Sequence, residues 1–304
     1  MNILLAVEEA AGIQTLKAVH QSEHKVVAVL TQSSIDSDSQ RGATVAGVAN
    51  NLGYDVWPAR RVKDPELATL IKEHEVDLLL NVHSLYIIHE AVVEAPRTGS
   101  FNLHPGPLPH YAGMNAPSWA IFNGEQSHGV TLHWMTAGID EGHIAYQTNF
   151  DLKASDTGLS VSTQCVRSGI QLIKNLLSAE AIPRHEQDFS KRKYFGFEVP
   201  FDGKINWAES SVTLERFIRA SDFYPLPSPW KTPLARLNGE PIGILKAALT
   251  DETAAAEAGT LKHEDSRVLV ATGEGWLELK KLMVAGKVIS PAEHLASSKK
   301  LESG

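Results

Sequence analysis

Three polar side chains of different chemistry stand in one stretch of the chain: the amide of Asn102, the imidazole of His104 and the carboxylate of Asp140. Asn102 and His104 are two residues apart, so in an extended strand both side chains leave the same face, about 6 to 7 Å apart. Asp140 lies in the glycine-bracketed loop 138–143, which follows the expected strand at 129–135. If these two segments are neighbouring strands, Asp140 can orient the imidazole of His104.

This set of groups, without a serine or cysteine nucleophile, indicates acyl transfer by direct attack of an amine. Asn102 would donate a hydrogen bond to the developing oxyanion, and His104 would carry the proton that the amine loses. Asp140 would hold the imidazole tautomer and stabilise its cation. The spacing by itself leaves the alternative open that the histidine is structural, because Asn-x-His pairs are common.

Two other chemistries are disfavoured. The loop at residues 8–12 has one glycine and two acids, and the chain has no G-x-G-x-x-G or P-loop pattern, so nicotinamide chemistry is not indicated. His128 and His133 lack the i, i+4 spacing of a zincin helix. The single cysteine, Cys165, cannot build a multi-cysteine zinc site. We therefore expect no metal.

The elements that must position the three groups alternate between apolar runs typical of buried strands and segments of helical period. This alternation predicts an α/β fold with a Rossmann-like, mostly parallel sheet and crossover helices. We expect strands at 2–7, 25–30, 99–103 and 129–135, helices at 11–22 and 157–177, and a helix followed by a strand within 65–82.

The character of the sequence changes after the long helix. Residues 184–204 mix charges, glycine and proline without a period, which is typical of a linker. Short β-rich runs follow, with a hairpin turn signal at Asn238-Gly239, and they predict a small antiparallel barrel. We expect a catalytic domain at 1–183, a linker at 184–204, a C-terminal OB-like or barrel-like domain at 205–296 and a disordered tail at 297–304.

Composition narrows the class of protein. The chain has 304 residues, 43% of them hydrophobic, and a net charge of -8. This length supports a buried core. The composition, with 43% hydrophobic residues, disfavours fibrous and wholly disordered proteins. The N-terminus has no basic n-region, and no stretch reaches the roughly 18 to 20 apolar residues of a membrane span. We therefore expect a cytoplasmic protein with no membrane partner.

The stretch FNLHPGPLPHYAG at 101–113, followed by NGE at 123–125 and GVTLHWMTAGIDEGHI at 129–144, resembles the 10-formyltetrahydrofolate-dependent formyltransferases. Their pattern is Asn-x-His, a Leu-Pro-x-Tyr-x-Gly turn and an Asp-x-Gly about three dozen residues later. The resemblance covers the chain to about residue 177. It continues through 194–207 and 215–227, which look like the link and C-terminal domain of methionyl-tRNA and aminoarabinose formyltransferases.

The resemblance implies the formyltransferase fold, with 10-formyltetrahydrofolate as cosubstrate and Asn102, His104 and Asp140 as the catalytic triad. It also implies that the backbone of two loops holds the pterin ring of the folate. The expected cosubstrate-binding residues are Tyr86, Ile87, Ile88, Met114, Thr136, Ala137, Gly138 and Ile139.

The distribution of charge bears on the amine that accepts the formyl group. An enzyme acting on tRNA needs clustered Lys and Arg. Residues 31–43, a loop that is basic in the tRNA enzymes the chain resembles, contain one Arg and two Asp, and residues 200–304 carry 13 basic and 14 acidic side chains. We therefore predict a small amine acceptor: a nucleotide-linked amino sugar or an aminoacyl group.

Other functions stay open. Methionyl-tRNA is the second candidate acceptor, although generic nucleic-acid binding is disfavoured. If water attacked instead of an amine, the same triad would make a 10-formyltetrahydrofolate hydrolase. A non-catalytic folate-binding module is a further alternative. The oligomeric state is left open.

Overall fold

The computed structural model describes residues 1–304 except 33–42 and 85. It contains two compact units that interleave along the chain. The first unit comprises residues 1–113, 129–150 and 164–194, and the second comprises 114–128, 151–163 and 195–304. Most of the loop at 31–43, on which part of the acceptor prediction depends, lies outside the described residues.

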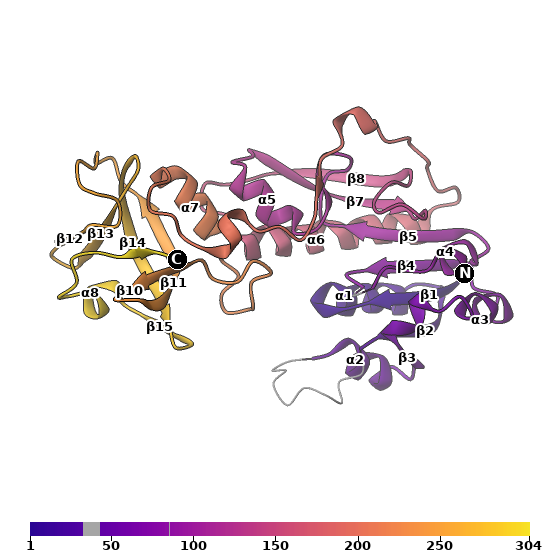
Figure 1. The fold of residues 1–304 in the computed structure, drawn as a ribbon. Helices are drawn as coiled ribbons and strands as arrows, with labels where there is room; N and C mark the ends of the chain where they lie inside the picture. Colours follow the sequence, from indigo (N-terminus) through magenta and orange to yellow (C-terminus); the bar gives the residue numbers. More distant parts are fainter. Residues whose placement is uncertain (33–42, 85) are drawn as a thin grey trace. The chain divides into compact units, whose positions relative to one another are not determined.

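A sheet with strand order β3-β2-β1-β4-β5-β7-β8 forms the frame of the first unit (Figure 1). From β3 to β5 each neighbouring pair is parallel, and β5 pairs with β7 in antiparallel fashion. The prediction of a mostly parallel α/β sheet is therefore confirmed. The strands are β1 (Asn2–Val7), β2 (Lys25–Thr31), β3 (Val56–Pro58), β4 (Leu78–Val82), β5 (Gly99–His104), β7 (Ser127–Trp134) and β8 (Ile144–Asp151).

The central parallel strands of this sheet, β1 and β4, are buried on both faces, as their nearly continuous apolar sequences require. Leu4 and Leu79 belong to a core that also contains Ile71 and Val92 from the crossover helices, while Leu5 is buried on the other face of β1. The helices are α1 (Glu9–His20), α2 (Val45–Asn51), α3 (Leu67–Glu73), α4 (Glu90–Glu94) and α6 (Gly158–Ser178), with a 3-10 helix at Ala59–Lys63.

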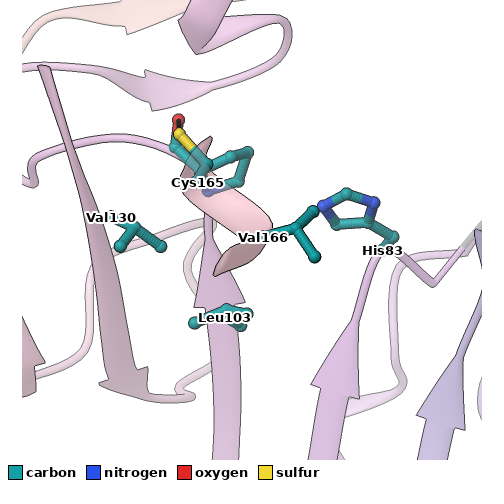
Figure 2. Close-up of a pocket in the computed structure, with 6 residues that line it drawn as sticks. His83, Leu103, Val130, Cys165 and Val166 are labelled. Atoms are coloured by element: carbon teal, nitrogen blue, oxygen red, sulfur yellow. Dashed lines mark hydrogen bonds between the residues drawn. The ribbon is translucent and has the colours of Figure 1, made fainter. Parts of the chain in front are cut away.

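Leu103 shows which face of β5 the long helix α6 covers. A Cβ placed at Gly169 of α6 would lie 2.6 Å from Leu103 Cδ2, so this glycine allows the helix to approach the strand closely. Figure 2 shows Leu103 and Val130 beside Cys165 of α6, whose thiol is buried. Burial raises the pKa of the Cys165 thiol, as expected for an inert packing residue. Since side chains alternate along a strand, Asn102 and His104 point to the opposite face of β5.

The second unit contains a curled antiparallel sheet with the order β12-β13-β14-β11-β10-β16, and β15 pairs with β14 (Figure 1). Asn238 and Gly239 join β10 to β11 with φ angles of 53° and 82°, the left-handed conformation of a two-residue hairpin turn. The hairpin prediction is confirmed. The strands are β10 (Leu234–Leu237), β11 (Glu240–Leu249), β12 (Leu261–Glu264), β13 (Arg267–Thr272), β14 (Gly275–Val284), β15 (Lys287–Ile289) and β16 (Glu302–Ser303).

The C-terminal residues differ from the expectation of a disordered tail. Glu302 and Ser303 pair with β10, and Leu301 is 1% exposed. The Leu301 amide also donates to the carbonyl of Gly259, 2.8 Å away. The expectation is wrong for these residues because Glu302 and Ser303 pair with β10 and Leu301 is buried, and neither contact is visible in the local sequence.

An aromatic cluster joins the helices of the second unit, α5 (Ala116–Phe122) and α7 (Ser211–Ala220). Trp230 is 1% exposed, and its ring centroid lies 4.9 Å from that of Trp119 and 6.4 Å from that of Phe217.

The remaining short elements are β6 (Ala112–Gly113), β9 (Tyr194–Phe195), α8 (Pro291–His294) and the 3-10 helices Phe189–Lys191 and Pro200–Gly203. In the part of the chain that is described, no helix combines the length and the apolar character needed to cross a membrane.

Candidate active site

The pairing of β5 with β7 brings the two motif segments together. Asn102 is directly opposite His133, and Phe101 is opposite Trp134. Segment 129–135 is therefore the neighbour of segment 99–103, as the sequence analysis supposes. The loop after β7 then returns Asp140 to the face of the sheet on which Asn102 and His104 lie.

His104 and Asp140 form a buried pair. Their side chains are 4% and 7% exposed, and His104 Nδ1 lies 3.4 Å from Asp140 Oδ2. The Gly113 amide donates to the same oxygen at 2.8 Å. His104 Nε2 faces the carbonyl of Tyr111. Because a carbonyl oxygen only accepts, Nε2 carries a proton here, and Nδ1 is the nitrogen at which the ring gains or loses its second proton.

Asn102 completes the group that the sequence analysis predicts. Its Nδ2 lies 3.1 Å from His133 Nε2 and 3.4 Å from Asp140 Oδ1. Its Oδ1 accepts a hydrogen bond of 2.9 Å from Asn81 Nδ2 on β4. The structure thus brings Asn102, His104 and Asp140 into one hydrogen-bonded cluster of the first unit.

His133 belongs to this cluster although the sequence analysis does not place it in the triad. Its Nε2 is 3.3 Å from Asp140 Oδ1, and its Nδ1 donates to the carbonyl of Trp134 at 2.8 Å. Two imidazoles therefore flank one carboxylate, one at each oxygen. The alternation of β7 places His133 and Trp134 on opposite faces, but only the pairing with β5 shows which of them faces Asn102.

The charges of the cluster depend on one another. Burial lowers the pKa of His104, and the Asp140 carboxylate and the Tyr111 carbonyl oppose this shift without cancelling it. Burial would raise the pKa of Asp140, but His104, His133 and the Gly113 amide outweigh it and hold the pKa well below its usual range. Asp140 is therefore ionised at neutral pH and stands beside a ring whose cation it stabilises.

The backbone of the Asp140 loop has little freedom. Asp140 has a φ of 55°, in the left-handed region that non-glycine residues seldom adopt. A Cβ on Gly142 would lie 1.7 Å from the carbonyl oxygen of Trp134, so no larger residue fits there without moving backbone. This contact explains why the motif needs glycine two residues after the aspartate.

The residues expected to bind the folate lie in different environments. Ile87 and Ile139 expose 72% and 44% of their surface, whereas Ile88 is 8% exposed and packs in the core. Tyr86 packs against the same core, and the Nζ atom of Lys63 lies 4.6 Å from its ring centroid. Thr136 and Ala137 are exposed and Gly138 is half-buried, while Met114, 39% exposed, belongs to the second unit.

These two loops of the first unit fit the group that the resemblance implies. A flat heteroaromatic ring needs exposed apolar side chains for its faces and backbone groups for its polar edge. Ile87 and Ile139 are such exposed apolar side chains, and the neighbouring residues Thr136 and Ala137 are exposed as well. Within the described residues, no group of three or more His, Cys, Asp or Glu side chains is arranged to hold a metal ion.

Comparison with known proteins is consistent with this site. The family model described as formyl transferase matches residues 2–175, and the model described as formyl transferase, C-terminal domain, matches residues 199–300. A methionyl-tRNA formyltransferase of Herpetosiphon aurantiacus is 31% identical over 294 residues, which are 94% of this chain and 94% of that protein.

Two solved structures share the fold. The N-formyltransferase from Helicobacter canadensis, in complex with folinic acid and dTDP-3-aminofucose, has a TM-score of 0.69 at 20% identity and covers 91% of this chain and 97% of its own. WlaRD, a sugar 3N-formyltransferase solved in the presence of dTDP and 5-N-formyl-THF, has a TM-score of 0.68 at 18% identity, covering 92% and 96%. Together with the matches along the sequence, they lead to one conclusion: this chain belongs to the formyl transferase family and is a formyl-transferring enzyme.

Proposed function

We propose that the protein is an N-formyltransferase that moves a formyl group from 10-formyltetrahydrofolate to the primary amine of a small acceptor. The observation that carries this proposal is the cluster of Asn102, His104 and Asp140, in which Asp140 Oδ1 lies 3.4 Å from Asn102 Nδ2 and Asp140 Oδ2 lies 3.4 Å from His104 Nδ1. In a chain of the formyl transferase family, this cluster contains the groups that amine formylation requires.

The folate is proposed as cosubstrate on two grounds. The structural relatives named above were solved with folinic acid or 5-N-formyl-THF. The loops at residues 86–88 and 136–139 each have an exposed apolar side chain, Ile87 and Ile139, of the kind that suits a pterin ring. When bound, the cosubstrate supplies the formyl carbon that the amine attacks.

The proposed roles follow from the chemistry of each side chain. The amine forms a new bond to the formyl carbon and loses one proton, and the folate nitrogen leaves with one proton. His104 carries this proton, and Asp140 stabilises the imidazolium that forms. Asn102 donates from Nδ2 to the oxygen on which negative charge develops. None of these steps needs a protein nucleophile.

The acceptor that we propose is a nucleotide-linked amino sugar or an aminoacyl group. The near balance of 13 basic and 14 acidic side chains at residues 200–304 supports a small acceptor, because RNA binding relies on clustered positive charge. The dTDP-linked amino sugar bound to the Helicobacter canadensis protein is one compound of this class.

Methionyl-tRNA is the second candidate, and a specific observation favours it. The relative from Herpetosiphon aurantiacus, which carries the name methionyl-tRNA formyltransferase, matches nearly the full length of both chains. A protein of negative net charge can still bind RNA through a local group of basic residues.

One assay separates these functions. Purified protein is incubated with 10-formyltetrahydrofolate and, in separate reactions, dTDP-3-aminofucose, methionyl-tRNA or no acceptor, and formylated product and free formate are measured. We expect formylation of the amino sugar, with little dependence on salt. Formylation of methionyl-tRNA alone, with a steep loss as salt rises, would establish the second candidate. Formate release without acceptor, at a rate that no amine increases, would identify a hydrolase.

A further inference from the structure

Gln187, which follows the long helix α6 and lies outside the sequence motif, holds the backbone of the Asp140 loop. Its side chain is buried, with 8% of the residue exposed. Its Nε2 donates to the carbonyl of Asp140 at 2.9 Å and to the carbonyl of Gly142 at 2.6 Å. One amide group therefore ties together the two carbonyls on either side of Glu141.

Arg192 holds the same loop from a second point. Its Nη2 donates to the carbonyl of Ile139 at 2.9 Å, and its Nη1 lies 3.4 Å from the carbonyl of Asp140. The same Nη2 also lies 3.5 Å from Oε1 of Glu141. The carbonyls of residues 139, 140 and 142 are thus all bound by side chains from one segment, 187–192.

The Asp140 loop needs such support. Asp140 adopts a left-handed φ of 55°, which a non-glycine residue holds only where its surroundings require it. Its carboxylate must also keep one oxygen near His104 and the other near His133. A small rotation of the backbone at Asp140 would move both oxygens, and catalytic geometry tolerates only small displacements.

We propose that Gln187 is a positioning residue for formyl transfer, which acts by fixing the backbone of Asp140, with Arg192 as a second support. This inference rests on the proposed function for its activity measurements, but its structural part is independent of it. Gln187 and Arg192 carry out no proton transfer of their own.

The chemistry of the Gln187 side chain makes the proposal specific. Only the NH2 end of the amide can face two carbonyl oxygens, so the orientation of the amide is determined. Gln187→Met keeps the length of the side chain and removes both donors. Gln187→Glu keeps the shape but places a carboxylate oxygen against the carbonyls, and only its protonated form has an O–H that can donate to one of them.

The test combines kinetics with a double-mutant cycle. Gln187→Met should lower kcat about 10- to 100-fold, as expected for two lost buried hydrogen bonds, and leave the KM for the folate within about threefold. In the Asp140→Asn variant, Gln187→Met should lower kcat by less than about threefold, because Gln187 acts by positioning the Asp140 carboxylate that is no longer there. Gln187→Glu should regain activity relative to the parent as the pH falls. Gln171→Met, on an exposed position of α6, is the matched control and should change nothing.

Several results would overturn the proposal. If the losses of kcat caused by Gln187→Met and by Asp140→Asn multiply in the double variant, the two residues act independently. Gln187 then does not act through Asp140. A folded Gln187→Met variant with parental kcat would have the same meaning. If Gln187→Met does not fold, Arg192→Met carries the same measurements at a less buried position, with a smaller expected loss of about 3- to 10-fold.

An NMR titration of the His104 ring, without substrates, separates this proposal from the proposed function. Gln187→Met should shift the titration midpoint of His104, because the Asp140 carboxylate moves relative to Nδ1, whereas Gln171→Met should not. If the parent protein transfers no formyl group, the proposed function fails, and this titration still decides whether Gln187 positions Asp140. An unchanged midpoint in the folded variant would overturn the inference.

Discussion

The side-chain amide of Asn81 donates to Oδ1 of Asn102 over 2.9 Å, from the adjacent parallel strand β4. This bond assigns the two ends of the Asn102 amide, since its oxygen is occupied and its Nδ2 must turn toward His133 and Asp140. The end of Asn102 that can donate is therefore directed to the histidine and carboxylate cluster by a residue outside the recognised motif.

Removing this donor should weaken catalysis moderately. We expect Asn81→Leu to lower kcat/KM about tenfold, because one buried hydrogen bond contributes about 0.5 to 1.5 kcal/mol and Asn102 becomes free to turn. Asn102→Ala, which removes the proposed oxyanion donor itself, should cost about two to three orders of magnitude. Steady-state kinetics with saturating folate measure both. Asn51→Leu, at an exposed position of α2, is the control. Parental activity of Asn81→Leu would contradict the role given to this bond.

The two histidines beside Asp140 should differ in their importance. We expect His104→Asn to lower kcat by about two to four orders of magnitude, the usual range for acid–base catalysis. His133→Gln should lower kcat about tenfold, since it disturbs the contacts of His133 Nε2 with Asn102 and Asp140 without removing the proton carrier. Folate affinity, measured by calorimetry, should stay near the parental value in both variants. A larger loss for His133→Gln than for His104→Asn would exchange the two roles.

Burial of His104 should make folding depend on pH. Its pKa is lower in the folded protein than the value of about 6.5 in an unfolded chain, so below about pH 6.5 the unfolded state binds more protons. The stability that His104 contributes is therefore complete above about pH 6.5 and is lost as the pH falls toward its folded pKa, by at most about 1.4 kcal/mol per pH unit. Asp140, whose pKa is also depressed, loses its contribution only below about pH 4.

Urea unfolding from about pH 7.5 to about pH 5 measures this dependence. The free energy of unfolding should fall less steeply with decreasing pH in His104→Asn than in the parent. Equal slopes for the two proteins would show that His104 does not titrate differently in the folded and unfolded states.

Gly142 should tolerate no side chain. A Cβ at this position would lie 1.7 Å from the carbonyl oxygen of Trp134, so Gly142→Ala must displace backbone next to Asp140. We expect a loss of about 1 to 3 kcal/mol in the free energy of unfolding, together with a loss of kcat. Gly47→Ala, within α2, places its Cβ 3.1 Å from the nearest atom and should change stability by less than about 1 kcal/mol. Equal stabilities of the two variants would refute the steric explanation.

The C-terminal residues should contribute to the stability of the second unit. Leu301 is 1% exposed, and Leu301→Ala should reduce the free energy of unfolding by about 2 to 5 kcal/mol. Leu249→Ala, at a residue that is 48% exposed, should cost less than about 1 kcal/mol. Urea denaturation of the three proteins compares them. A near-parental Leu301→Ala protein would indicate that the last strand adds little to this unit.

The sequence by itself determined the features that depend on local periodicity. The alternation of strand and helical segments predicted the parallel sheet, and the spacing of Asn102 and His104 placed both on one face of β5. Asn238-Gly239 predicted its hairpin because the turn requires two residues in the left-handed region. Each of these signals is contained in a few neighbouring residues.

Tertiary structure decided which distant residues meet. The register of β5 against β7 placed His133 opposite Asn102, and the neighbouring strand β4 supplied Asn81. The path of the chain after α6 brought Gln187 to the carbonyls of the Asp140 loop, and the last residues pair with β10. Such hydrogen bonds join residues far apart in sequence, and their formation depends on packing and register, which the local pattern of apolar and polar residues does not encode.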